Sequence, residues 1–188
     1  MKQTIIAVIC FLCVSSLYIQ AQKINHPSLL YTPQRIQQVK QRMQHEPKLQ
    51  EAWGDIKKTA DEALQKKDFN RLDYLSLAYL MTDNKEYADV IKEILLKTVE
   101  AESWGDVEMM ARIPAWRSQL GMAHKSFLSA VGYDAAYNVM SSSERKKIAE
   151  GLKRLAVEPA LGDWLLEPTR IHSLNSMGHN WWTSCVCQ

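Results

Sequence analysis

The sequence predicts an all-α fold made of successive helical hairpins, and three observations support this prediction. Apolar residues recur at helical spacing along most of the chain after residue 32, and no segment shows a convincing β-strand pattern. Capping residues and short polar turns separate the helical segments. The hairpins recur at roughly 40–50 residues, which fits either an open solenoid or a closed α/α toroid. The long connections carry tryptophans, and this favours an incomplete toroid with a cleft on one face.

The first predicted helix covers about residues 33–45. Thr32 supplies a hydroxyl cap, and Pro33 occupies the first helical position. Pro47 interrupts this helix, and a second helix is expected over residues 47–67. The apolar positions of the second helix are Trp53, Ile56, Ala60 and Leu64.

The clearest hairpin lies between residues 72 and 98. Residues 72–81 (LDYLSLAYLM) are apolar around most of the helix circumference, so this helix is expected to be buried. Asp83 is expected to cap the next helix, with Glu86 three residues later. One apolar face of that helix consists of Tyr87, Val90, Ile91, Ile94, Leu95 and Thr98. Because the connecting turn is short, the two helices must lie antiparallel.

The stretch from residue 102 to 116 is less regular and carries Trp104 and Trp116. Helical spacing returns over residues 118–140. The apolar positions of this segment are Leu120, Ala123, Phe127, Val131 and Ala135. We therefore expect a long connection followed by a long helix.

Residues Ser141 to Glu144 form a capping box that opens another helix, and Pro159 is expected to end it. Residues 160–177 are expected to form a loop, and a last helix is expected to begin near Gly178. That helix has barely two turns before the sequence ends and shows no C-terminal cap. We therefore expect residues 23–188 to be the truncated N-terminal portion of an α/α toroid domain.

Residues 1–22 have the pattern of a secretory signal peptide. Lys2 precedes an apolar run from Ile5 to Leu17, and the small residue Ala21 follows. This run is too short to span a bilayer comfortably, so cleavage is expected near Ala21. Lipidation at Cys13 is the weaker alternative, because the residue before it is not small. The mature chain is expected to be periplasmic or secreted, without membrane contact.

Composition and charge restrict the remaining function classes. Hydrophobic residues make up 46% of the chain and charged residues 23%, values typical of a globular protein with a formal net charge of +2. The basic triplet at residues 145–147 is flanked by Glu144 and Glu150, which indicates a solvated helix face and no nucleic-acid partner. Cys185 and Cys187 would point about 200° apart on a helix and lack further metal ligands, so no metal or cofactor is expected.

The segment of greatest chemical interest is SMGHNWWTSCVCQ, residues 176–188. Trp181 and Trp182 would diverge by about 100° on a helix, so one is expected to pack inward and the other to line a groove. A tryptophan ring stacks on the apolar face of a sugar, and its N–H bonds a hydroxyl group. His179 and Asn180 would add donors for hydroxyl or carboxylate groups. In the alternative interpretation, both tryptophans fill the core and His179 caps the helix.

Four segments in this order resemble one enzyme family. They are residues 75–89 (LSLAYLMTDNKEYAD), 130–152 (AVGYDAAYNVMSSSERKKIAEGL), 158–161 (EPAL) and 178–187 (GHNWWTSCVC). Together they resemble the helical N-terminal domain of the heparinase II/III-like polysaccharide lyases. Residues 180–182 (Asn-Trp-Trp) also resemble the aromatic patch of the hyaluronate and chondroitin lyases, which share an incomplete α/α toroid.

The resemblance implies β-elimination on a uronic acid. A base removes the proton at C5, an acid protonates the leaving oxygen at C4, and the neighbouring carboxylate must be neutralised. Residues 180–182 would then hold the polysaccharide, with His179 beside them. The proton-transfer residues of such lyases lie downstream of the matched segment, so the resemblance assigns no catalytic residue here. Tyr133, Tyr137 and His124 have suitable chemistry but lie in ordinary helix patterns, and the tyrosines are expected to pack in the core.

The expected function is therefore that of the N-terminal part of a secreted lyase acting on uronic-acid polysaccharide, inactive by itself. One alternative is an α/α-toroid glycoside hydrolase acting on uronyl oligosaccharides. It would need a pair of acids in one cleft, for which Asp106, Glu108 and Asp163 are loop candidates. Another alternative is a non-catalytic helical carbohydrate-binding module. In each case the expected partner is an acidic polysaccharide or oligosaccharide.

Overall fold

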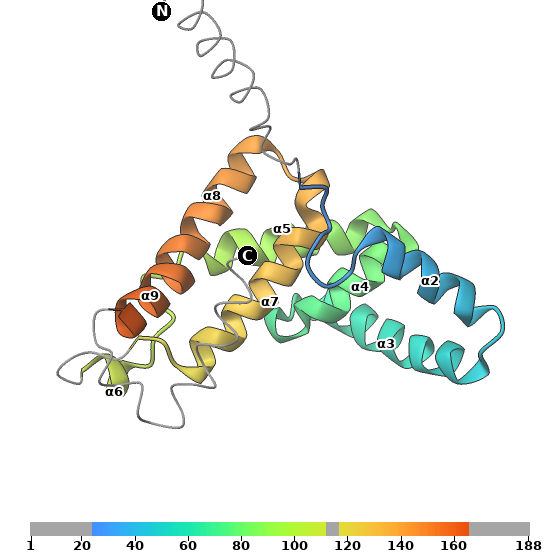
Figure 1. Ribbon diagram of the computed structural model, residues 1–188, viewed down its shortest axis with the longest axis horizontal. Helices are drawn as coiled ribbons and strands as arrows, with labels where there is room; N and C mark the ends of the chain where they lie inside the picture. Colours follow the sequence, from blue (N-terminus) through green and yellow to red (C-terminus); the bar gives the residue numbers. More distant parts are fainter. Residues whose placement is uncertain (1–23, 112–116, 166–188) are drawn as a thin grey trace, which may run out of the picture.

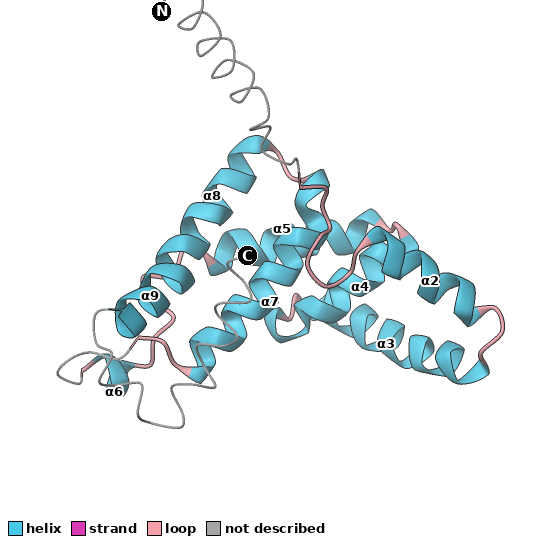
Figure 2. Cartoon of the chain, viewed as in Figure 1, coloured by secondary structure: helices cyan, strands magenta, loops and turns pink. Residues whose placement is uncertain are grey.

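The computed structural model of the protein describes residues 24–111 and 117–165, and these residues form helices and no strand. The all-α prediction is confirmed for this part of the chain, in which short loops join most of the helices (Figure 2). The α-helices are α2 (Pro33–Met43), α3 (Pro47–Lys66), α4 (Leu72–Thr82), α5 (Lys85–Thr98), α6 (Val107–Met110), α7 (Leu120–Ala136), α8 (Ser142–Leu152) and α9 (Glu158–Leu165). Two 3₁₀ turns, η1 (Phe69–Arg71) and η2 (Tyr137–Val139), and a π turn, η3 (Lys153–Val157), join some of them.

The first hairpin, α2 and α3, has the ends that its sequence predicts. Thr32 Oγ1 accepts a hydrogen bond from the backbone N–H of Arg35 at 3.3 Å, and Pro33 takes the first helical position. α3 ends where Lys67 enters the left-handed region with a φ of 50°. Both helices predicted for this region are confirmed.

The central hairpin, α4 and α5, is also confirmed, but its turn differs by one residue from the prediction. α4 packs against α3, α5 and α7, which buries Leu72 and Leu75 completely. Asp83 does not cap α5, because it is the left-handed residue, with a φ of 58°, that ends α4. The next residue, Asn84, is the cap, and its side chain accepts the backbone N–H of Glu86 at 3.1 Å.

α7 crosses α4 and α5 and completes the core (Figure 1). Small residues let it approach closely: a Cβ atom added at Gly132 would lie 3.3 Å from both Leu72 and Ile91. The largest fully buried hydrophobic side chains are Tyr87, Leu72, Leu75, Ile91, Leu95, Met122, Leu128, Ile148 and Leu155. These side chains come from α4, α5, α7, α8 and the π turn, so one apolar core joins these elements.

The path after α8 differs from the expectation. Ser141 Oγ accepts the Glu144 N–H at 3.2 Å and Glu144 accepts the Ser141 N–H at 2.8 Å, so the capping box is confirmed. Pro159 does not end the helix, because the π turn leads directly into α9 and Pro159 is the second residue of α9. Proline is tolerated in a first turn, where its missing N–H removes no bond within that helix. Residues 160–165 therefore lie in a helix and not in the expected loop.

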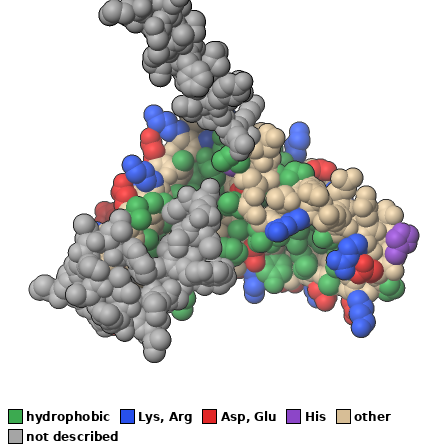
Figure 3. Space-filling model, viewed as in Figure 1, with side chains coloured by type: hydrophobic (Ala, Val, Ile, Leu, Met, Phe, Trp, Pro, Cys, Tyr) green, Lys and Arg blue, Asp and Glu red, His purple; other side chains and the backbone are tan. Residues whose placement is uncertain are grey.

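The basic triplet at residues 145–147 lies on α8, as the prediction of a solvated helix face requires. Lys146 pairs with Glu150 at 3.9 Å and Lys147 with Glu100 at 2.9 Å, and all four side chains are more than half exposed. Figure 3 shows basic and acidic side chains alternating along this edge. The positive charge of the triplet is therefore largely balanced by its neighbours.

Among the described helices, α2 packs on α3 and α4 on α5, whereas α8 follows α7 through η2, diverges from it and contacts α5 as well (Figure 1). Closure of such hairpins into a toroid stays a prediction. Within residues 24–111 and 117–165, each helix is too short or too polar to cross a membrane.

Candidate functional site

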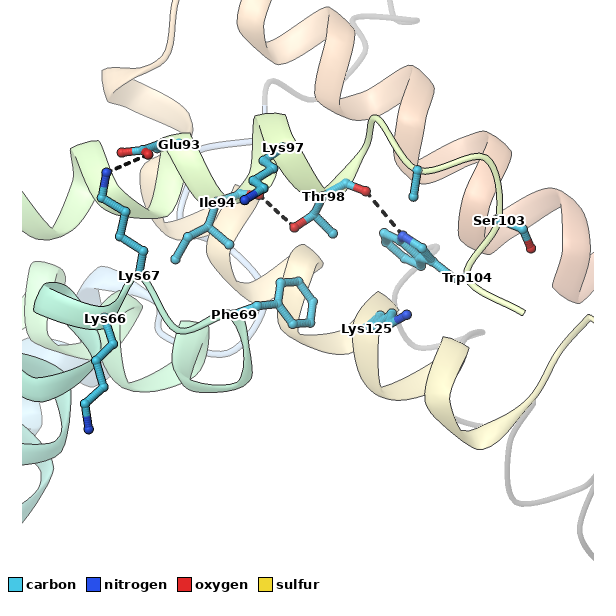
Figure 4. Close-up of a pocket in the computed structure, with 11 residues that line it drawn as sticks. Lys66, Lys67, Phe69, Glu93, Ile94, Lys97, Thr98, Ser103, Trp104 and Lys125 are labelled. Atoms are coloured by element: carbon cyan, nitrogen blue, oxygen red, sulfur yellow. Dashed lines mark hydrogen bonds and ion pairs between the residues drawn. The ribbon is translucent and has the colours of Figure 1, made fainter. Parts of the chain in front are cut away.

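A surface hollow of about 570 Å³ lies where the end of α3, the C-terminal half of α5 and α7 meet (Figure 4). We call it the lysine hollow, because four of its charged residues are lysines. Those residues are Lys66, Lys67, Lys97 and Lys125, and the one carboxylate among the described lining residues is Glu93. The remaining lining residues are Phe69, Ile94, Thr98, Ala101, Ser103 and Trp104. This volume falls in the range of small-molecule binding sites.

The end of α3 provides one side of the lysine hollow. The left-handed conformation of Lys67 turns the chain away from the helix axis. Asp68 then accepts the backbone N–H of Asn70 at 3.0 Å, which starts the turn η1. This turn places Phe69 half-buried against the core, with its ring at the hollow (Figure 4).

α5 provides a second side. Glu93 and Lys97 are four residues apart, so they share one face of the helix. Lys67 Nζ donates to Glu93 Oε1 at 2.6 Å, and both side chains are more than half exposed, so this pair contributes about 1 kcal/mol at most. The pair neutralises one end of the hollow. Lys97 lies in the last turn of α5, where its charge also favours the helix dipole.

The connection after α5 forms the far wall, and side chains hold it in place. Trp104 is only 5% exposed and donates its indole N–H to the carbonyl of Thr98 at 3.3 Å. Arg154, from the π turn, donates to the carbonyls of Val99 at 2.9 Å and Glu102 at 3.1 Å. The wall is therefore fastened to two other elements, and Trp104 offers little free surface to a ligand.

Lys125 reaches the hollow from α7, at the end occupied by Trp104 (Figure 4). Among the residues that the structure describes, Lys66, Lys97 and Lys125 form no ion pair, whereas Lys67 pairs with Glu93. The hollow therefore carries three ammonium groups that have no carboxylate partner in the described part of the chain. Such an excess of one charge attracts ligands of opposite sign.

The arrangement is suited to binding an anionic ligand. The lysines attract acid groups, and the half-buried Phe69 ring can pack against an apolar sugar face. Glu93, the one carboxylate among the described lining residues, is ion-paired with Lys67. In the described part of the hollow, no unpaired carboxylate is placed for proton transfer.

The residues that the sequence predicts to bind sugar, His179, Asn180, Trp181 and Trp182, lie outside the described residues. Their role stays a prediction. His124 lies exposed on α7, next in sequence to the hollow residue Lys125.

Tyr133 and Tyr137 were expected in the core, but both are half-buried, and Tyr133 alone packs against the edge of the core. Their rings meet edge to face at 5.6 Å, and His26 stacks on Tyr137 at 3.8 Å. Tyr133 Oη donates to the carbonyl of Arg145 at 3.4 Å. Burial raises the pKa of the Tyr133 phenol, which disfavours the phenolate that a base would need.

The neighbouring Asp134 is 3% exposed and anchors the segment that precedes α2. Its carboxylate accepts the backbone N–H groups of Ser28 and Leu29, each at 2.8 Å. It also lies 2.6 Å from His26 Nδ1, and Asn138 bonds the carbonyl of His26 at 2.9 Å. Asp134 therefore has a structural role, which the sequence did not indicate.

The acidic residues considered for a hydrolase do not form a loop-borne pair among the described residues. Asp163 lies in α9, is buried, and accepts the backbone N–H groups of Arg117 and Ser118, both at 2.6 Å. Asp106 accepts the N–H of Glu108 at 2.9 Å and caps α6. The expectation of loop acids is therefore wrong for Asp163, in α9, and for Glu108, in α6, whereas Asp106 lies at the N-cap of α6. The carboxylates of Asp106 and Asp163 already stabilise local structure.

The lysine hollow itself was not predicted. Its cations come from α3, α5 and α7, and about thirty residues separate one contributing segment from the next. A search for basic patches in a sequence finds runs of neighbouring charges, and these lysines form no such run. Only the tryptophan in the long connection gave a partial signal, since Trp104 forms part of the far wall.

Comparison of the chain with protein-family models, with curated proteins and with solved structures finds no match. The resemblance to the heparinase II/III-like lyases therefore rests on the four sequence segments alone. Residues 75–89, 130–152 and 158–161 lie in described helices and their connections, and residues 178–187 lie outside the described part.

Proposed function

We propose that this chain is the helical N-terminal part of a secreted lyase that cleaves uronic-acid polysaccharide by β-elimination, and that it helps to hold the acidic substrate. The observation that carries this proposal is the lysine hollow, with three ammonium groups that have no paired carboxylate among the described residues. The reaction type comes from the sequence resemblance. Both point to a carbohydrate that carries negative charge.

The hollow supplies the two kinds of contact that an acidic sugar needs. Ammonium groups attract the acid groups, and the Phe69 ring packs on the apolar sugar face. In the proposed enzyme, His179, Asn180, Trp181 and Trp182 extend the binding surface. Proton transfer is assigned to residues outside this chain.

Binding by the mature chain tests the charge part of the proposal. The purified chain without residues 1–22 is titrated with a polyuronate, with a sulfated glycosaminoglycan and with neutral dextran. We expect the acidic polymers to bind, the affinity to fall as salt is added, and dextran not to bind. Equal affinity for dextran, or no binding to either acidic polymer, would contradict the proposal.

An activity assay tests whether β-elimination depends on residues outside this chain. The products of β-elimination contain a double bond that absorbs in the near ultraviolet. We expect the mature chain alone to produce no rise in this absorbance with acidic polysaccharides. A rise would show that the proton-transfer residues lie within this chain.

The two tryptophans near the end of the sequence provide a further test. We expect one of Trp181→Ala and Trp182→Ala to lower stability by about 3 kcal/mol, as for a core residue. The other should unfold normally and weaken binding to an acidic oligosaccharide, and Asn180→Ala should behave like it. If both tryptophan variants lose only stability, these residues are part of the core and do not bind sugar.

A further inference from the structure

Two unpaired lysines of the lysine hollow lie apart from each other. Lys97 comes from the last turn of α5 and Lys125 from α7, and Figure 4 draws the Phe69 ring between them. In the same view, Lys66 points away from Phe69. The hollow therefore presents two separate positive charges with an aromatic ring between them.

Nearby carboxylates do not neutralise these two charges. Among the described residues, neither Lys97 nor Lys125 forms an ion pair. Glu100 pairs with Lys147 at 2.9 Å, and the pKa of Glu100 is lowered mainly by that hydrogen bond and charge, with Lys97 contributing least. The one carboxylate on α7 is Asp134, which bonds the backbone of the segment before α2. Both ammonium groups are thus available to a ligand.

The separation of the lysines restricts the size of the ligand. A small molecule with a single acid group meets one of two separated ammonium groups, and one such contact near the surface is weak. A ligand with an acid group at each end engages both, and the second contact then forms within one molecule. The hollow, of about 570 Å³, lies in the range of pockets that hold drug-sized ligands, which are larger than one sugar unit.

Phe69 determines what lies between the two acid groups. Its ring is half-buried against the core and follows the turn η1, so its position is set by the fold. An aromatic ring offers an apolar face on which a sugar ring packs, and it offers no charge to an acid group. The lining therefore suits the order acid group, sugar ring, acid group.

We infer that the lysine hollow binds an acidic oligosaccharide of at least three units, in which the sugar ring packed on Phe69 separates two uronate units, one at Lys97 and one at Lys125. This inference rests on the proposed function, because it names the length and the spacing of acid groups that the hollow recognises. A single uronate is too short to engage both lysines.

Oligosaccharides of increasing length test the inference. The mature chain is titrated with galacturonate, digalacturonate, trigalacturonate and the neutral trisaccharide maltotriose under the same conditions. We expect trigalacturonate to bind about tenfold more tightly than galacturonate, because it adds the second lysine and the ring contact. Digalacturonate has no unit between its acid-bearing units, so it should bind within about threefold of galacturonate. Maltotriose should not bind.

Matched variants locate the site. Lys97→Gln and Lys125→Gln should each weaken trigalacturonate binding about threefold, and the double variant about ninefold, because separated lysines act on different acid groups. Phe69→Leu keeps an apolar side chain without the aromatic face and should also cost about threefold. Lys58→Gln is the control, because Lys58 is exposed on α3 and does not line the hollow. Thermal unfolding verifies that each variant folds.

The contrary outcomes separate this inference from the proposed function. Equal affinities for trigalacturonate and digalacturonate overturn the inference, because neighbouring acid groups then suffice. A double lysine variant that binds trigalacturonate no more weakly than either single variant also overturns it. If trigalacturonate binds no better than galacturonate while polygalacturonate still binds, the proposed function stands without this inference. Absence of binding to every acidic polymer removes the proposed function as well.

Discussion

The lysine hollow and the carboxylates of Asp134 and Asp163 differ in whether their charges have partners. Asp134 and Asp163 are each at most 6% exposed, and each accepts several hydrogen bonds from a distant segment of the chain. The ammonium groups of Lys97 and Lys125 lie nearer the surface and have no carboxylate partner among the described residues. A buried charge must be satisfied for the fold to be stable, whereas an unmatched charge at a hollow stays available to a ligand.

The largest effect is expected when one of the two buried, hydrogen-bonded carboxylates is removed. Asp134→Ala removes the acceptor for the N–H groups of Ser28 and Leu29, and should lower the free energy of unfolding by about 3 kcal/mol in a urea titration. Asp55→Ala is the control, because Asp55 is exposed on α3. A loss no greater than that of the control would show that the segment before α2 needs no anchor.

The next prediction compares one substitution at two places. A Cβ atom at Gly151 would overlap Val99, so Gly151→Ala should destabilise the protein by about 2 kcal/mol. Gly54 on α3 has no atom within 4 Å of such a Cβ, so Gly54→Ala should stabilise by about 1 kcal/mol through helix propensity. Chemical unfolding measures both. Equal signs for the two variants would contradict the tight packing of α8 against the end of α5.

A smaller effect concerns the far wall of the lysine hollow. Arg154→Lys keeps the charge but loses the fork that bonds the carbonyls of both Val99 and Glu102. We expect faster amide hydrogen exchange over residues 99–106 and a loss of about 1 kcal/mol in stability. Lys153→Arg, on the same π turn, should leave this exchange unchanged. Unchanged exchange in Arg154→Lys would mean that the Trp104 contacts alone hold the wall.

The smallest effect is the pH dependence of the capping box. Hydrogen bonds from Ser141, its backbone N–H first, lower the pKa of Glu144. A folded-state pKa below the unfolded value contributes stability at higher pH, and this contribution is lost as pH falls through the folded pKa. Glu144→Gln should therefore lower stability near pH 7 and make its decline toward about pH 3 shallower.

The control for this pH series is Glu62→Gln, because Glu62 is exposed on α3 and forms no ion pair among the described residues. Its profile should follow that of the unmodified protein. An identical profile for Glu144→Gln would show that the capping box contributes no pH-dependent stability.

Features that depend on neighbouring residues were predictable from the sequence. Thr32 and Pro33 start α2, and the box from Ser141 to Glu144 starts α8, because these caps involve residues within one turn. The wrong predictions concern positions at which two local conformations have similar energies. Asp83 and Asn84 can both cap a helix, and the left-handed turn decided between them. Pro159 can end a helix or sit in its first turn, and the π turn decided that case.

The candidate site was less predictable than the helices. The expected sugar-binding residues at positions 179–182 lie outside the described part, so that prediction stays open. Within the described part, Asp163 was expected in a loop and instead fastens the start of α7 to α9. Its role depends on contacts between segments about 45 residues apart, which helical spacing does not reveal.

By itself, the sequence determined that this protein is built from amphipathic helices with defined caps and short turns, because those properties act over a few residues. Tertiary structure decided which charges are satisfied and which are left free. Asp134 accepts a hydrogen bond from Ser28, 106 residues away, whereas Lys97 and Lys125 line one hollow and have no carboxylate partner among the described residues. The energy of a charge depends on its burial and on its partners in space, and packing of the helices sets both.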